Sequence, residues 1–198
     1  MTVMNRRSLL LASAALALAG CSSDPVPVDT YYRLETTVSA TRPGGPLKGI
    51  AEVMPIRGEG VVNGRAILFR RSETEIRPYS YHFWADTPAS MLQRQLVDAL
   101  RAGQAFDSVA LPEMRLQRDY EIMGTLRKLE HDATQNRVIV EIEFSVRKVR
   151  NSEVQVLKVY KAEATARGDD VTGAVAGFSA ALGQVFADLI ADLGRIAP

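Results

Sequence analysis

The sequence begins with a segment of a kind that is cut off during export, and this determines which part of the chain can fold. Arg6 and Arg7 precede an apolar run over residues 9–20 (LLLASAALALAG). A short cationic region followed by about a dozen apolar residues is the layout of a secretory signal. The run is too short to cross a bilayer, which takes about 20 helical residues, and no second run approaches that length. We therefore predict that residues 1–20 are a signal peptide.

The apolar run ends at the only cysteine of the chain, in Leu18-Ala19-Gly20-Cys21. This tetrapeptide resembles a bacterial lipobox, in which the cysteine thiol is diacylated, for example with palmitate, the leader is cut off before it, and the new amino group is acylated. Anchors with more than one acyl chain hold stably at a membrane. We predict Cys21 as the lipidation site; an ordinary leader with a chance cysteine and a buried core thiol are the alternatives. No thiol then remains for disulfide, redox or metal chemistry.

The residues around Cys21 bear on where the chain goes. Residue 22 is Ser rather than Asp, which by resemblance to the sorting of enteric lipoproteins favours the periplasmic face of the outer membrane. Arg6 and Arg7 with their neighbours also resemble a twin-arginine signal, so the export route, Sec or twin-arginine, stays open. Residues 21–30 read as a lipidated cysteine and a flexible linker. Its prolines favour extended geometry, so nine residues reach about 28 Å and keep the domain close to the lipid surface.

Removal of the leader changes the composition only slightly. Taking 20 of the 198 residues away, Arg6 and Arg7 among them, leaves 178 residues with 22 basic and 23 acidic side chains, a net charge of −1. This balance argues against a nucleic-acid or polyanion binder. Apolar residues make up 46% of the whole chain, which is enough for a packed core. A chain of this size buries about 70% of its unfolded surface, so we expect residues 31–198 to form one domain.

Hydrophobic periodicity predicts strands, a helix, more strands and a second helix. Thr87 is the expected N-cap of the first helix, which begins at Pro88 and ends at Gly103. Pro78 indicates an edge strand or a bulge, and Asn63-Gly64 predicts a hairpin turn. The expected strands are 31–38, 49–56, 61–62, 65–71, 76–84, 108–111, 120–131, 137–150 and 154–166, and the helices are 88–102 and 171–197.

This order predicts an α/β (α+β two-layer) fold in which a mixed or mostly antiparallel sheet packs with two main helices in a single domain. The alternation in residues 138–146 gives one core face and one wet face. Gly173, Gly177 and Gly183 in the last helix indicate close backbone packing. Asp169-Asp170 is best explained as the cap of that helix.

Residues typical of catalysis are missing, so we predict no enzyme, no cofactor and no metal site. His82 and His131 lack metal-ligand spacing, and His82 reads as a strand histidine on a half-exposed face. The glycines of 58–64 lack the spacing of a dinucleotide loop. Gly177-Phe178-Ser179 lacks the second glycine of a nucleophile elbow and lies within a helix.

Two features could serve a surface instead. Tyr79, Tyr81 and Trp84 belong to an aromatic run that predicts either core and edge packing or contact with a partner or phospholipid. The basic pairs Arg70-Arg71 and Arg147-Lys148 read as solvated strand faces, with contact to anionic lipid headgroups as the alternative.

Several segments, in their order along the chain, resemble the ABC-type transport auxiliary lipoprotein family (PqiC/YmbA-like). After Cys21 come Tyr31-Tyr32-Arg33-Leu34, Val53-Met54-Pro55, the stretch 63–70, Trp84-Ala85-Asp86 before the helix of 91–100, and Phe178-Ser179-Ala180-Ala181-Leu182 in the closing helix. The resemblance covers nearly the whole mature chain.

The resemblance implies a non-enzymatic role. Such lipoproteins work with an MCE-domain protein and the permease and ATPase of an ABC transporter, which move phospholipid or other lipid between the inner and outer membranes. It implies docking of that assembly at the outer membrane, and a homo-oligomer is compatible with it. Two alternatives are an assembly factor for outer-membrane proteins and a lipid- or lipoprotein-binding chaperone. The chaperone would need an apolar cavity between residues 138–146 and the last helix.

Overall fold

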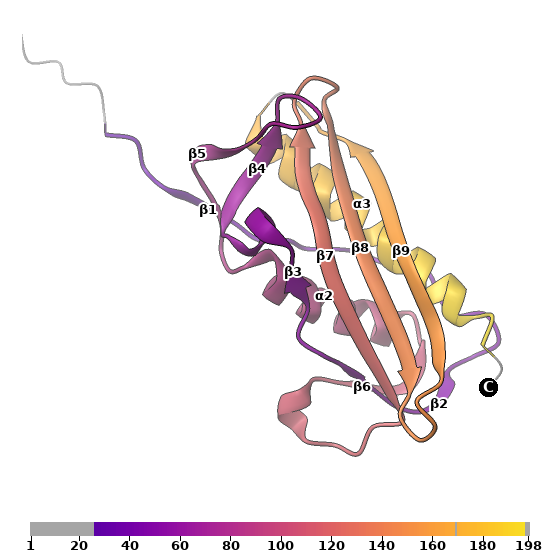
Figure 1. Cartoon of the computed structure of the whole chain (residues 1–198). Helices are drawn as coiled ribbons and strands as arrows, with labels where there is room; N and C mark the ends of the chain where they lie inside the picture. The colour runs from indigo at the N-terminus through magenta and orange to yellow at the C-terminus, as the bar shows by residue number, and fades with distance from the viewer. Residues whose placement is uncertain (1–25, 169, 197–198) are drawn as a thin grey trace, which may run out of the picture.

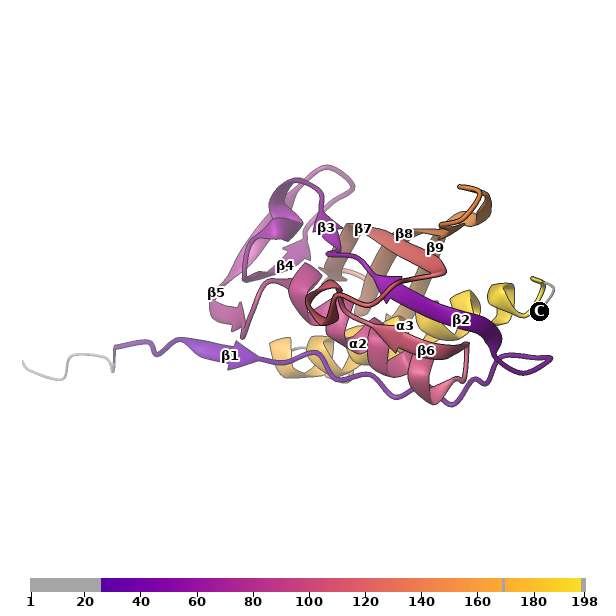
Figure 2. The same ribbon diagram turned by 90° about the horizontal axis from the view of Figure 1, so that it is seen from below.

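Three long antiparallel strands, packed on the last helix, form the largest part of the structure. A computed structural model describes residues 26–168 and 170–196, in which nine strands form a single mixed sheet. Both helices lie on the same face of that sheet (Figures 1 and 2). The strands are β1 (Thr30–Tyr32), β2 (Leu47–Val53), β3 (Arg57–Gly58), β4 (Ala66–Arg70), β5 (Ile76–Trp84), β6 (Phe106–Ala110), β7 (Tyr120–Asp132), β8 (Arg137–Lys148) and β9 (Val154–Thr165). The helices are α2 (Pro88–Ala102) and α3 (Val171–Leu193), with 3-10 turns η1 (Gly60–Asn63) and η2 (Pro112–Met114). The predicted fold class is confirmed.

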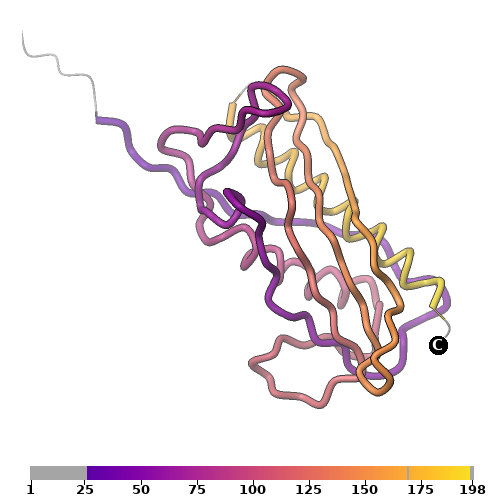
Figure 3. The backbone as a smooth tube through the Cα atoms, viewed as in Figure 1, coloured from indigo at the N-terminus to yellow at the C-terminus, as the bar shows by residue number. Residues whose placement is uncertain are grey.

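Strand β7 organises the sheet. Along one edge it pairs antiparallel with β8, which pairs antiparallel with β9. Along its other edge it meets β2, β3 and β4 in turn, each of them parallel. The sheet therefore consists of a ribbon (β7, β8 and β9) from which two wings depart. The N-terminal wing consists of β4, β5 and β1, and the second wing of β2 and β6. The smooth tube of Figure 3 follows this path without a break between the wings and the ribbon.

The inner face of the ribbon carries the core. The five alternating apolar residues of β8 are fully buried against α3, as the sequence predicts. They are Val138, Val140, Ile142, Phe144 and Val146. Burial of one such side chain contributes about 1.5–3 kcal/mol. The ribbon and α3 are therefore the scaffold on which the wings are built.

Both helices begin as the sequence predicts. The Thr87 hydroxyl accepts a hydrogen bond from the amide of Ser90 at 3.4 Å, Pro88 is the first helical residue, and Gly103 caps the end. Asp170 accepts from the amide of Gly173 at 2.7 Å and caps α3, while Asp169 lies outside the described residues. Each cap satisfies an amide that the helix leaves without a partner.

The glycines of α3 allow the close packing that the sequence predicts. A Cβ atom at Gly177 would lie 3.2 Å from the carbonyl oxygen of Thr165, and one at Gly183 would lie 3.1 Å from that of Thr37. Against our expectation, α3 is long and apolar enough to cross a membrane by length and composition alone. Half of its most apolar stretch is buried in the fold. Here it is a core helix, and it ends at Leu193, before the predicted residue 197.

The structure corrects two predictions in the N-terminal third. The strand predicted over 31–38 is only β1, because Thr36 beyond it gives its amide to the side chain of Gln95 on α2, at 2.8 Å, instead of to a neighbouring strand. The hairpin at Asn63-Gly64 is wrong: residues 60–63 form η1, and the φ of Gly64 is −75°. The Asn63 side chain instead accepts from the amide of Gly58 at 3.1 Å, which closes a separate loop.

Candidate functional site

Cys21, the predicted lipidation site, and the predicted signal peptide lie outside the described residues. The described chain begins at Val26, and Val26 and Val28 are strongly exposed before the chain enters β1. Lipidation of Cys21 therefore stays a prediction. The described part shows where the linker leads, which is to the outermost strand of the N-terminal wing (Figure 1).

Strand β1 brings the linker directly onto the aromatic run of β5. The two strands pair parallel, with Tyr31 opposite Phe83 and Tyr32 opposite Trp84. The ring centroids of Tyr31 and Phe83 are 5.9 Å apart, and the Tyr32 hydroxyl lies 3.0 Å from Nδ1 of His82. A run predicted from one strand is thus part of a two-stranded aromatic surface, which becomes visible only when the pairing of β1 is known.

The three candidate contact residues of β5 do not share one environment. Trp84 is 1% exposed and its ring meets that of Phe178 on α3 edge-on, with centroids 5.6 Å apart. The structure assigns Trp84 to the core rather than to a contact surface. The reason is the alternation of the strand, which turns Trp84 toward the helices and Phe83 away from them.

Tyr79 occupies an intermediate position. Its ring lies 4.6 Å from that of Phe69, and its hydroxyl lies 2.6 Å from Nδ1 of His131. Burial raises the pKa of Tyr79 and lowers that of His131, so both groups favour their neutral forms. Tyr79 therefore links β5 to the ribbon. His82 is half-buried, as predicted, and its ring meets that of Tyr79 edge-on.

Tyr81 is the residue of this run that is open to solvent. Its side chain is 48% exposed and its φ is +62°. It lies in a bulge between the pairs Ala66–Phe83 and Leu68–Pro78, where β5 has four residues opposite a single residue of β4. Pro78 thus marks a bulge, as the sequence allows. A bulge re-aims a side chain, and a bulky residue at positive φ is strained.

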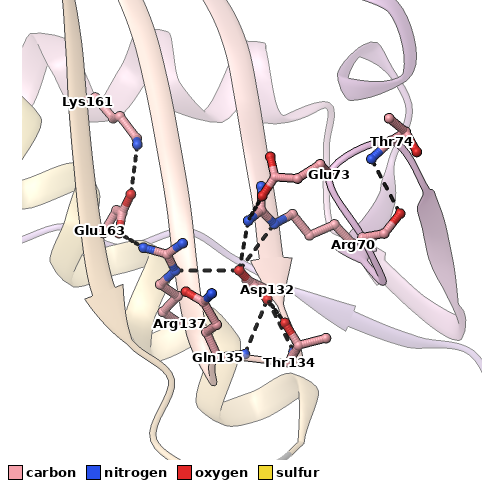
Figure 4. A network of polar contacts seen from close by, with 10 residues as sticks. Arg70, Glu73, Thr74, Asp132, Thr134, Gln135, Arg137, Lys161 and Glu163 are labelled. Carbon is pink, nitrogen blue, oxygen red and sulfur yellow. Dashed lines mark hydrogen bonds and ion pairs between the residues drawn. The ribbon is translucent and has the colours of Figure 1, made fainter.

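In each basic pair, one arginine forms an ion pair within the fold. The Arg70 side chain is only 15% exposed and its Nη2 lies 2.9 Å from Oδ2 of Asp132, which corrects the prediction of a solvated arginine (Figure 4). Arg147 pairs with Glu121. Burial alone would raise the pKa of Asp132, but hydrogen bonds from Thr134 and Arg70 outweigh it and lower the pKa to about 2. This network joins the N-terminal wing to the ribbon, a role that spacing along the sequence does not reveal.

The interior between the ribbon and the last helix is filled. Phe144, Phe178 and Phe186 are fully buried, and the rings of Phe144 and Phe186 are 6.5 Å apart. The faces that would line a lipid cavity therefore pack directly on each other in the described part of the chain. No group of three His, Cys, Asp or Glu side chains that could hold a metal occurs among the described residues.

The comparisons with known proteins agree in family and fold. The sequence profile of the family described as ABC-type transport auxiliary lipoprotein component matches residues 32–190. No protein with a curated record matches the chain significantly.

Solved structures show a similar fold at low sequence identity. A crystal structure of a Xanthomonas campestris protein of family DUF330 has a TM-score of 0.71 at 20% identity, covering 81% of this chain and 92% of that one. A second crystal structure, of an uncharacterised protein, has a TM-score of 0.64 at 15% identity over 85% and 98%. The PelC dodecamer from Paraburkholderia phytofirmans has a TM-score of 0.48 at 13% identity over 82% and 96%. At these identities the first two show the fold alone.

Proposed function

Because the chain belongs to the ABC-type transport auxiliary lipoprotein family, we propose that it is the non-enzymatic auxiliary component of an ABC/MCE-type system that moves phospholipid or other lipid between the inner and outer membranes. Its partners are an MCE-domain protein and the permease and ATPase of the transporter. Acyl chains on Cys21 hold it on the periplasmic face of the outer membrane, where it docks the assembly.

The observation that carries the proposal is the extent of the family match. The matched residues, 32–190, run from the last residue of β1 into the last turn of α3, and so include the other eight strands, α2 and nearly all of α3. Family membership makes the chain an envelope-associated lipoprotein of an ABC-type transport system. The MCE partner, the outer membrane and the docking role complete the proposal.

The filled interior supports docking over carriage of lipid. A chaperone that carries an acyl chain needs an apolar cavity, and the inner faces of β8 and α3 are packed on each other in the described residues. What this domain offers a partner is its surface. A docking component needs a stable scaffold and a fixed position at the membrane, and these are supplied by the ribbon and by the acylated linker.

Co-purification from envelope membranes tests the proposal. The full-length chain with a C-terminal affinity tag is expected to bring down the MCE-domain protein and the permease after mild detergent extraction, with identification by mass spectrometry. Capture of outer-membrane protein assembly factors without either transporter component would overturn it, as would abundant lipid bound to the chain after removal of detergent.

The anchor is tested separately with Cys21→Ser. This variant is expected to accumulate as an unacylated precursor or soluble form, and mass spectrometry of the wild type should show acyl chains on Cys21. Outer-membrane fractions that contain Cys21→Ser as fully as the wild type would contradict the anchor and the docking site together.

A further inference from the structure

We propose that the outer edge of the N-terminal wing, formed by Tyr31, Tyr81 and Phe83, rests in the headgroup region of the bilayer that holds Cys21. We call these three residues the aromatic edge. The inference takes from the proposed function only the acylated anchor, and it names the surface of the domain that meets the membrane.

The aromatic edge is exposed and preformed. Tyr31 is 55% exposed and Tyr81 is 48% exposed, and the Tyr31 ring packs on that of Phe83. Tyrosine combines an apolar ring with a polar tip, which is why it gathers where a bilayer meets water. The edge therefore has the chemistry of an interfacial anchor rather than that of a dry protein interface.

Two arginines flank these rings. The Arg65 guanidinium lies 5.3 Å from the centroid of the Tyr31 ring and donates to the carbonyl oxygens of Trp84 and Ala85, each at 3.1 Å. Arg33, the second residue after Tyr31, is exposed and has no ion-pair partner among the described residues. Each basic side chain close to an anionic membrane surface adds electrostatic attraction to it. The nearby Asp29 and Asp86 limit that contribution, so the rings carry the contact and the arginines orient it.

Tyr81 is held in place at a cost. A bulky residue in the left-handed region is strained, and such residues persist only where the surrounding structure fixes them. The bulge of β5 keeps this ring turned to solvent, where it gains little from packing within the domain. If the Tyr81 ring contacts the headgroup region of the bilayer, the strained backbone serves to place it there.

The linker brings the aromatic edge to the bilayer. Nine residues separate Cys21 from Tyr31, and they reach about 28 Å at most in polyproline geometry. Val26 and Val28, both strongly exposed, lie between the anchor and the edge. Figures 1 and 2 show that β1 leaves the body at one end of the molecule while the C-terminus lies at the other. The wing is therefore the part of the described fold that the linker joins, and so the part that is closest along the chain to Cys21.

A spin label placed beside the aromatic edge tests the proposal on the acylated full-length chain. Because acylation uses Cys21, a new cysteine is the only free thiol. Ser80→Cys labels an exposed position next to Tyr81 and leaves all three rings intact, and Leu157→Cys labels an exposed site on β9 as the control. In vesicles of phosphatidylethanolamine and phosphatidylglycerol, the label at 80 is expected to collide with oxygen rather than with a water-soluble nickel complex. The ratio of its collision rate with oxygen to its collision rate with the nickel complex should be several-fold higher than for the label at 157. Equal ratios at the two sites would overturn the proposal.

A pair of ring substitutions then separates the edge from the anchor. Tyr31→Ser with Tyr81→Ser, in the Ser80→Cys chain, should bring the label back to the value at 157 while the protein stays with the vesicles. Met114→Ser with Leu116→Ser, a similarly exposed pair between β6 and β7, should leave the label in lipid. A label that stays in lipid without the two tyrosines refutes the role of the rings. Loss of the wild type from the vesicle fraction would instead show that the anchor has failed. A label shielded only when transporter components are added would assign the edge to a protein partner and overturn the proposal.

Discussion

The ribbon and the N-terminal wing are both built from β-strands, but they differ in strand length, regularity and burial. The strands of the ribbon have 12 or 13 residues and hold their register nearly throughout, and the central strand β8 buries one face completely. The wing has strands of three, five and nine residues, with a long bulge and aromatic rings left in solvent. A fold that needed only stability would have no reason to keep such a wing. The ribbon is built for stability, whereas the wing leaves apolar rings in solvent, as a contact with the bilayer would require.

The largest expected effect comes from a cavity in the ribbon. Phe144 is fully buried, with its ring 5.9 Å from that of Tyr160. Phe144→Ala should lower the free energy of unfolding by about 3–5 kcal/mol, because the cavity adds to the lost burial. Urea unfolding measures the loss. Leu157→Ala, on the 66% exposed side chain of β9, should stay within about 0.5 kcal/mol of the wild type. Similar losses in both variants would contradict the role of the ribbon as scaffold.

The next effect is an acid-dependent loss at the junction between wing and ribbon. The pKa of Asp132 is lowered from 3.8 to about 2 in the fold, and its side chain is 2% exposed. A carboxylate with a lowered pKa stabilises the fold above its unfolded pKa, and this stability is lost as the pH falls through the folded value. Stability should therefore fall by about 2 kcal/mol between pH 5 and pH 2.

Variants identify the group responsible for this pH dependence. Asp132→Asn should be less stable at pH 7, because the Arg70 guanidinium loses its buried charge partner and keeps only the exposed Glu73, and it should lose most of the acid slope. Glu143→Gln removes a more exposed carboxylate, paired with Arg127, and should keep the slope. The measurement is urea unfolding at a series of pH values. An unchanged slope in Asp132→Asn would contradict the assignment.

The two regions also differ in how far their sequences predict them. In the ribbon and the helices the signals are local: alternation in 137–148, Thr87-Pro88 before a helical stripe, Asp170 before α3. In the wing the decisive contacts are distant in sequence. The Gln95 side chain accepts a hydrogen bond from the amide of Thr36, and Asp132 forms an ion pair with Arg70. Strand β1 pairs with β5, which lies about fifty residues further along the chain. No local pattern predicts these partners, which is why the sequence leaves Trp84 open between core and contact surface and predicts a solvated Arg70, whereas Trp84 is buried and Arg70 is largely buried in an ion pair.

A smaller effect concerns the hydroxyl that ties β5 to the ribbon. Tyr79→Phe removes the hydrogen bond to His131 and leaves Nδ1 of a buried imidazole without its partner, so it should cost about 1 kcal/mol. The matched substitution Tyr31→Phe changes a hydroxyl that lies 3.5 Å from Asp29 in solvent, and should cost almost nothing. Thermal unfolding of both variants at pH 7.5 makes the comparison. Equal effects of the two substitutions would mean that the hydrogen bond of Tyr79 to His131 does not stabilise the fold.

The smallest expected effect on stability is at Tyr81, because its ring is proposed to contact the bilayer rather than to stabilise the fold. Tyr81→Gly relieves the strain of a left-handed residue, about 1–2 kcal/mol, and adds back about 1 kcal/mol of flexibility in the unfolded chain. The net change should lie within about 1 kcal/mol of the wild type. Tyr81→Ala loses the same ring but keeps the strain, so it should be about 1 kcal/mol less stable than the glycine variant. A glycine variant markedly less stable than alanine would show that the ring or the backbone at 81 supports the fold. If the glycine variant is instead as stable as the wild type, the Tyr81 ring contributes little to the stability of the domain, as the proposed contact with the bilayer requires.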